Sequence, residues 1–197
     1  MDDAAAKAHL HGSLQQAREA VLWKLDGLGE YDARRPLTPT GTNLLGLLKH
    51  LAFVEAGYFA DAFDRPMTEG PRWDDLGDDE TADMWATADE SRDELVATYR
   101  RTIAHADGTI TELPLDAEGH VAHWPAERNP VTLHAMLVHV VAETQRHAGH
   151  VDIVRELIDG AAGRQPGNDN LAPGDADAWA RHRGRVERAA REAAGRP

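Results

Sequence analysis

TLHAMLVHVVAETQRHAGHVDIVRELI, residues 132–158, is the stretch of sequence that decides the fold of this chain. Its apolar side chains recur at helical spacing, and Gly160 just beyond it is the residue type that commonly ends helices. His139, Glu143 and Arg146 interrupt the apolar run, so the stretch is too polar to cross a membrane. It therefore predicts a long amphipathic helix that turns one face into a core.

Three more amphipathic helices are predicted, over residues 5–27, 42–63 and 83–112. The connections between the helices are long and rich in polar residues, Pro and Gly. One of them, the acidic stretch 67–80, has the length of a mobile segment or a lid. No alternation of period two competes with the helical pattern, and no strand is expected. These features predict an all-α fold, a four-helix bundle with long connections.

The end of the chain differs in composition from the bundle. Residues 1–165 are expected to form the bundle domain, and residues 166–197 a linker followed by a helix at 176–194. That helix is rich in Arg and Ala, and its apolar stripe is weak, with Trp179 and Val186 as its large members. We expect it to be a peripheral element, packed on or beside the bundle.

Composition excludes several classes of site. The 197 residues include no Cys, so there is no disulfide scaffold, zinc–thiolate site, iron–sulfur cluster or cysteine nucleophile. The formal net charge of −13 argues against nucleic acid and against an anionic membrane surface as partners. The first residues lack the apolar core of a signal peptide, so a cytoplasmic location is expected.

Histidine is abundant, and four polar residues share one arc of the helix at 132–158: His139, Glu143, His147 and His150. Glu143 and His147 lie one turn apart, close enough to bind one ion. A carboxylate on a largely apolar face requires a cation, hydrogen bonds or a raised pKa. A divalent metal would satisfy both side chains, although an ion pair or hydrogen-bonded pair without metal is the alternative.

A third ligand is expected from a facing helix, and His50 in LLGLLKHLAFVE, residues 44–55, is the candidate. Three protein ligands leave a coordination position open, as catalytic metal sites do. His150 is a candidate fourth ligand, an outer hydrogen-bond partner or a polar flank of the helix. His139 is expected to be a hydrogen-bonding neighbour.

Three motifs carry a resemblance to a known family: residues 34–55, RRPLTPTGTNLLGLLKHLAFVE; residues 88–101, ADESRDELVATYRR; and residues 139–160, HVVAETQRHAGHVDIVRELIDG. Over residues 10–160 the chain resembles the DinB-like superfamily of metal-binding four-helix bundles, in the branch near the mycothiol-dependent maleylpyruvate isomerases and other thiol transferases. The resemblance implies His50, Glu143 and His147 as ligands of a divalent metal, zinc or nickel before iron or manganese. It also implies a homodimer. The isomerases carry an added C-terminal domain that this chain lacks, so maleylpyruvate is not expected as the substrate.

The resulting functional hypothesis is a metal-dependent enzyme that activates a low-molecular-weight thiol, mycothiol, for S-transfer or detoxification. Tyr58 and His150 are the candidate catalytic bases. One alternative is a hydrolase that uses metal-bound hydroxide at the same ligands. Another is a non-catalytic metal- or ligand-binding stress or sensor protein, and the last is a metal-free dimerising domain.

Overall fold

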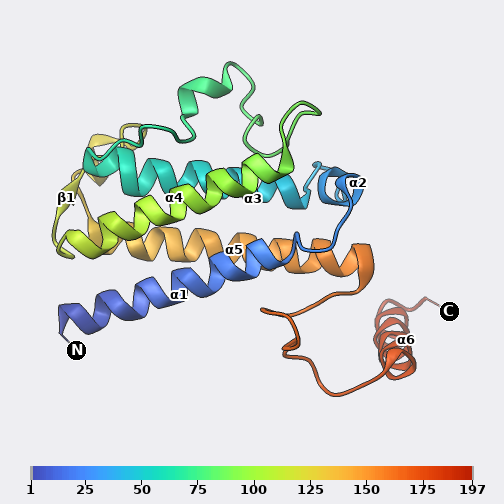
Figure 1. Ribbon diagram of the computed structural model, residues 1–197. Coiled ribbons are helices and arrows are strands. Elements are labelled where there is room, and N and C mark those ends of the chain that lie inside the picture. Colours follow the sequence, from blue (N-terminus) through green and yellow to red (C-terminus); the bar gives the residue numbers. More distant parts are fainter. Residues whose placement is uncertain (1, 197) are drawn as a thin grey trace.

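The computed structural model describes residues 2–196 and shows a four-helix bundle (Figure 1). The predicted all-α class is therefore confirmed. In the bundle α1 packs along α5, and α3 packs along α4. The bounds of these long helices are α1 Asp3–Trp23, α3 Leu44–Glu55, α4 Arg92–Glu112 and α5 Leu133–Asp159.

The first helix ends at Trp23, before the predicted end at residue 27. The reason is tertiary: Arg155 of α5 is buried and donates hydrogen bonds to the carbonyls of Lys24 at 2.7 Å and Asp26 at 2.9 Å. The chain turns away after these capped carbonyls. The connection that follows holds one short helix that the sequence analysis does not predict, α2 Glu30–Arg34.

The helix predicted from residue 83 begins only at Arg92, where the hydroxyl of Ser91 caps α4. Residues 81–86 instead form turns that cross α3 closely. A side chain at Gly46 would place its Cβ 1.8 Å from the carbonyl oxygen of Met84, so the crossing requires glycine there. The Asn43 amide donates a hydrogen bond of 3.2 Å to the same oxygen. This contact holds the segment against the bundle.

The helix predicted at 42–63 is helical to its predicted end, but its geometry changes on the way. After Glu55 the α-helix becomes a π-helix, η1 Ala56–Ala60, and then a 3₁₀ turn, η2 Asp61–Phe63. Asp64 ends it with a left-handed φ of 53°. Such π turns inside helices occur frequently at functional sites.

The expectation of no strand is wrong for one small feature. Two strands, β1 Glu118–Gly119 and β2 Val131–Thr132, pair antiparallel in the connection between α4 and α5. The backbone N–H of His120 also donates to the carbonyl oxygen of Ala62, at 2.7 Å. The connection is thereby held against the end of η2, where a Cβ at Gly119 would lie only 2.6 Å from the same oxygen. Strands this short carry no periodicity that a sequence could reveal.

Two apolar clusters fill the bundle. The first joins the C-terminal halves of α1 and α5 to the start of α3, and the second joins the opposite ends of the same helices to α4. The largest residues of the first are Leu25, Leu44, Leu45, Leu47, Leu48, Leu51 and Tyr99. Those of the second are Leu14, Phe59, Ile110, Leu133, Met136 and Leu137.

A buried charged group lies inside this apolar interior. The guanidinium of Arg18 donates to both carboxylate oxygens of Glu55, at 2.9 Å and 2.5 Å. The hydroxyl of Tyr99 donates to Glu55 at 3.3 Å, and Arg18 also reaches Asp107 at 2.7 Å. Arg18 is 1% exposed and Glu55 is fully buried. The group joins α1 to α3 and α4 through paired charges.

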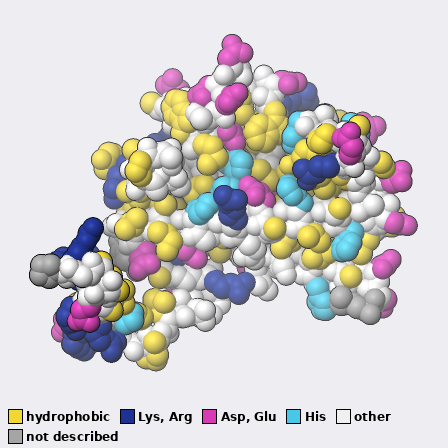
Figure 2. Space-filling model, turned by 180° about the vertical axis from the view of Figure 1, so that it is seen from behind, with side chains coloured by type: hydrophobic (Ala, Val, Ile, Leu, Met, Phe, Trp, Pro, Cys, Tyr) yellow, Lys and Arg dark blue, Asp and Glu magenta, His cyan; other side chains and the backbone are white. Residues whose placement is uncertain are grey.

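The last helix, α6 Ala176–Ala193, stands at the end of a long linker, apart from the bundle (Figure 1). None of its residues is buried. Figure 2 shows it as a separate lobe rich in Arg side chains. The division into residues 1–165 and 166–197 stays a prediction. Among the described residues, no helix is both long enough and apolar enough to span a membrane.

Candidate metal centre

The structure brings His50, Glu143 and His147 together from two facing helices. His50 lies on α3, and the other two lie one turn apart on α5. The Nε2 atom of His147 is 2.9 Å from Oε1 of Glu143, and Nε2 of His50 is 3.7 Å from the same oxygen. Each residue offers one donor atom, and the three atoms all lie within 4.8 Å of one another. We call these residues the triad.

The donor set fits a divalent transition metal. Two imidazole nitrogens and one carboxylate oxygen are ligands that zinc, nickel and iron accept in proteins. The donor atoms of the three side chains lie close together. Two of the side chains are half-buried, and His147 is only 7% exposed. Three donors from the protein leave at least one coordination position for a further ligand.

Electrostatics favours the protonation states that a ligand set needs. Burial lowers the pKa of His147, and the neighbouring His50 lowers it further, against the opposing effect of Glu143. For Glu143, burial acts to raise the pKa, but the hydrogen bond and charge of His147 and the charge of His50 outweigh it, so the pKa is lowered. The result is an ionised carboxylate beside an imidazole that stays neutral to lower pH than usual.

Both imidazoles of the triad also have a partner at Nδ1, the ring nitrogen that does not face Glu143. The Nδ1 atom of His50 lies 2.5 Å from Oδ2 of Asp83, a carboxylate that is 5% exposed. The Nδ1 atom of His147 lies 3.3 Å from Nδ1 of His150. Partners at the far nitrogen fix the tautomer and orientation of a metal-binding histidine. Asp83 was not singled out from the sequence, because the turns at 81–86 have no periodic pattern.

The candidate catalytic bases lie in different places. Tyr58, on η1, lines a cavity of about 410 Å³ that also reaches His50 and Glu143. Burial raises the pKa of Tyr58, and the charge of Glu143 adds to the effect, so its hydroxyl is protonated at neutral pH. His150 is exposed and contacts the triad only through the far nitrogen of His147. The geometry therefore brings Tyr58, and not His150, to the cavity.

The rings of Tyr58 and His139 both line this cavity. The ring centroid of His139 lies 4.7 Å from that of Tyr58 and 5.2 Å from that of Trp124. Burial lowers the pKa of His139, although the charge of Glu143 opposes the shift. The predicted role of His139 as a hydrogen-bonding neighbour of the site stays a prediction. Figure 2 shows His side chains at the middle of one face of the molecule, beside acidic and basic ones.

Comparison with known proteins gives one finding about family. The model of the family described as mycothiol-S-transferase (MST) matches residues 9–160. The match covers α3, α4 and α5 and most of α1, and it contains all three triad residues. The chain matches none of the curated proteins with which it was compared.

Proposed function

This chain belongs to the mycothiol-S-transferase family, and we propose that it is a divalent-metal-dependent enzyme that activates a thiol, mycothiol, for transfer to an electrophile. The observation that carries the proposal is the convergence of His50, Glu143 and His147 beside a cavity. We propose zinc or nickel as the metal, with iron or manganese as the next choices.

In this proposal the triad holds the metal, and the cavity beside it admits the thiol and its acceptor. A divalent metal held by the triad would act as a Lewis acid and lower the pKa of the thiol. The thiol proton passes to water, and sulfur forms a bond to the electrophilic carbon. The bond from that carbon to the leaving group breaks, and the leaving group departs with the electron pair.

The chain's own residues have three tasks in this transfer. Glu143 provides the negative charge of the ligand set, and His50 and His147 provide neutral nitrogens. Asp83 positions His50. We assign Tyr58 the task of a hydrogen-bond donor in the cavity, because its raised pKa keeps the phenol protonated.

The cavity also bears on the alternative functions. A non-catalytic metal protein would be favoured by a closed ligand shell, with His150 in the fourth position. Instead His150 lies behind His147, and the cavity opens beside His50 and Glu143. This arrangement supports an enzyme. A hydrolase would use the same ligands and differ only in what occupies the open position.

The decisive experiment measures bound metal and then thiol transfer. Elemental mass spectrometry of purified protein should find close to one metal per chain in the wild type. It should find the same in His134→Ala, which removes an exposed histidine of α5 that lies outside the triad. His147→Ala should lose at least about 90% of the metal, because two ligands bind far more weakly than three.

Metal-loaded wild type should then accelerate the reaction of mycothiol with 1-chloro-2,4-dinitrobenzene, followed by absorbance, and His147→Ala should not. Wild-type protein that neither contains metal nor binds added zinc or nickel would overturn the proposal. Loaded protein that hydrolyses esters or amides but leaves mycothiol unchanged would favour the hydrolase.

The assembly and location of the protein are further parts of the proposal. We propose a homodimer in the cytoplasm, where low-molecular-weight thiols are kept reduced. Three exposed apolar side chains of α5, Val138, Ile153 and Leu157, offer surface for a contact between copies. Light scattering on the full chain measures its mass in solution, and a monomeric mass would refute the dimer.

A further inference from the structure

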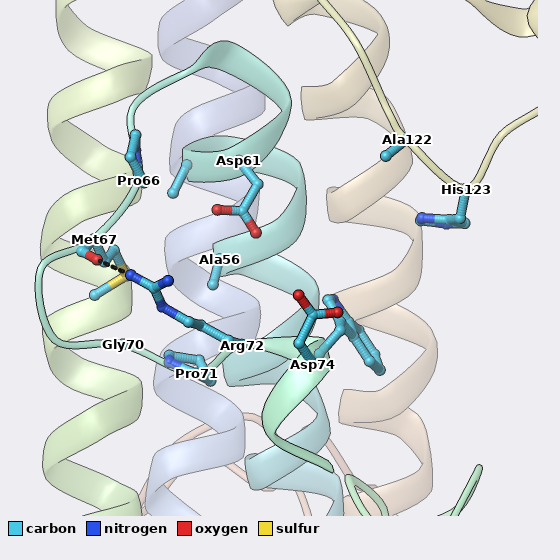
Figure 3. Close-up of a pocket in the computed structure, with 12 residues that line it drawn as sticks. Ala56, Asp61, Pro66, Met67, Gly70, Pro71, Arg72, Asp74, Ala122 and His123 are labelled. Atoms are coloured by element: carbon cyan, nitrogen blue, oxygen red, sulfur yellow. Dashed lines mark hydrogen bonds between the residues drawn. The ribbon is translucent and has the colours of Figure 1, made fainter. Parts of the chain in front are cut away.

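A second, larger cavity adjoins the one beside the triad. Its volume is about 640 Å³, within the range of small-molecule sites. Its floor is formed by Ala56 and Ala60 of η1, and its outer wall by the loop at 66–74 (Figure 3). We call it the outer cavity. The two cavities share the lining residues Asp61, Trp73, Ala122 and His123. A molecule in the outer cavity therefore lies next to the space that reaches His50 and Glu143.

The outer cavity is lined mainly by apolar groups. Small alanines form the floor, and the loop adds Pro66, Met67 and Pro71. Methionine adapts to the shape of an apolar ligand, and aromatic side chains favour flat ones. These surfaces therefore favour a flat apolar ligand.

Trp73 stands between the two cavities and is held in place from the bundle. Its ring centroid lies 5.3 Å from that of Phe53 on α3. Gly57 of η1 leaves room for the indole, since a Cβ at that position would lie 3.1 Å from Nε1 of Trp73. The π-helix and the loop thus build this wall together, and a ligand in the outer cavity lies against an aromatic ring that packs on Phe53.

The charges at the outer cavity are unbalanced. Asp61 and Asp74 face it with one guanidinium, that of Arg72, which gives a formal charge of −1 (Figure 3). Burial raises the pKa of Asp61, the charge of Asp74 raises it too, and Arg72 opposes them. An anionic ligand would meet two carboxylates and one guanidinium, so the charges that line the outer cavity disfavour it. The chain as a whole, at −13, adds to the repulsion.

From this geometry and charge we propose that the outer cavity binds the electrophile of the transfer, and selects flat apolar electrophiles that are uncharged or cationic over anionic ones. The inference rests on the proposed function for the identity of its ligand. The binding preference itself requires neither metal nor thiol.

Binding of three unreactive nitroaromatic probes tests the preference. 3-Nitrobenzamide is neutral, 3-nitrobenzamidinium is cationic, and 3-nitrobenzenesulfonate is anionic; sulfonate is chosen because it is a weak metal ligand. Titration calorimetry on the full chain should give dissociation constants for the first two at least about threefold below that of the sulfonate, the order expected for one net charge carried by exposed side chains. Equal affinities for all three would overturn the proposal.

Variants locate the site. Asp61→Asn should tighten the binding of the sulfonate about threefold and leave that of the benzamide unchanged, because only the charge is removed. Asp78→Asn is the control, with the same charge change at another exposed aspartate, one that does not line the outer cavity. Trp73→Ala should weaken all three probes about tenfold or more, since it removes the stacking surface. Equal effects of Asp61→Asn and Asp78→Asn, or wild-type binding by Trp73→Ala, would overturn the assignment.

The outcome is separable from that of the proposed function. If the probes bind as described but loaded protein transfers no thiol, the outer cavity stands and the proposed function fails. If thiol transfer occurs but the affinities of the probes are unchanged in Asp61→Asn and Trp73→Ala, the proposed function stands and this inference fails.

Discussion

Each histidine of the triad divides its two ring nitrogens between different tasks. His50 turns Nε2 toward Glu143 and keeps Nδ1 against Asp83. His147 likewise directs Nε2 to Glu143 and Nδ1 to His150. A carboxylate that accepts a hydrogen bond from one ring N–H holds the proton on that nitrogen and leaves the other nitrogen unprotonated, which is the form that binds a metal. Asp83 therefore acts on the site through His50.

Asp83→Asn should weaken metal binding about tenfold to a hundredfold, because the amide fixes the tautomer and orientation of His50 less strongly. Competition with a chromogenic chelator measures the affinity. Asp89→Asn, an exposed aspartate of the same connection, is the control and should keep wild-type affinity. If Asp83→Asn bound metal with wild-type affinity, the Asp83 carboxylate would not be needed to position His50. Asp83→Glu should recover part of the loss.

The helix α1 is joined to the rest of the bundle by a buried ion pair as well as by apolar packing. Arg18 and Glu55 form two hydrogen bonds in a region where neither side chain is exposed by more than 1%. Burying both charges costs much of what their attraction returns, so the pair adds little net stability. Losing one partner is different, because the remaining charge is then buried alone.

Arg18→Met should lower the free energy of unfolding by ~3–5 kcal/mol, the usual effect of an unpaired buried charge. The double variant Arg18→Met with Glu55→Leu should recover most of that loss, since no charge is left buried. Urea denaturation followed by circular dichroism measures all three proteins. A loss below about 1 kcal/mol in the single variant would mean that water reaches Glu55.

The π-helix η1 explains why one element serves both the core and the site. Its wider turn shifts the register of the side chains after Glu55, so Phe59 remains buried while Gly57 and Tyr58 face the cavity. A continuous α-helix would place these residues differently. Helical periodicity in the sequence predicted the length of this segment but not the change in its geometry.

The molecule as a whole is an acidic bundle that carries a separate helix of different charge. Residues 176–193 contain five arginines and three acidic residues, whereas the full chain has a net charge of −13. The helix buries no residue against the bundle. An element that buries no apolar surface adds little to the stability of the fold.

A chain that ends at residue 165 should therefore unfold at a temperature within about 2 °C of the full chain. It should also retain full metal content, because all three triad residues lie in the bundle. Scanning calorimetry and elemental mass spectrometry measure the two properties. A drop of more than about 5 °C would show that α6 docks on the bundle in solution, as the sequence led us to expect.

Much of the fold was predictable from local patterns. The four long helices, their order and the C′ glycine at Gly160 followed from apolar spacing and end signals. The predicted C-terminal end of α1 and the predicted start of α4 were wrong, because contacts from Arg155 and from α3 determine where these helices end and begin. The two short strands could not be predicted, since their pairing joins residues that the sequence does not mark as strand.

The sequence by itself determined which residues are candidates for the chemistry: Glu143 and His147 share a helical face, and His50 lies beside the apolar stripe of another helix. Periodicity is sufficient for that, because it fixes directions within one helix. Only the tertiary structure decided the distances between His50 and α5, the position of Asp83 behind His50, and the two cavities. These depend on how separate helices and irregular loops pack against one another, and packing between segments leaves no regular pattern in the sequence.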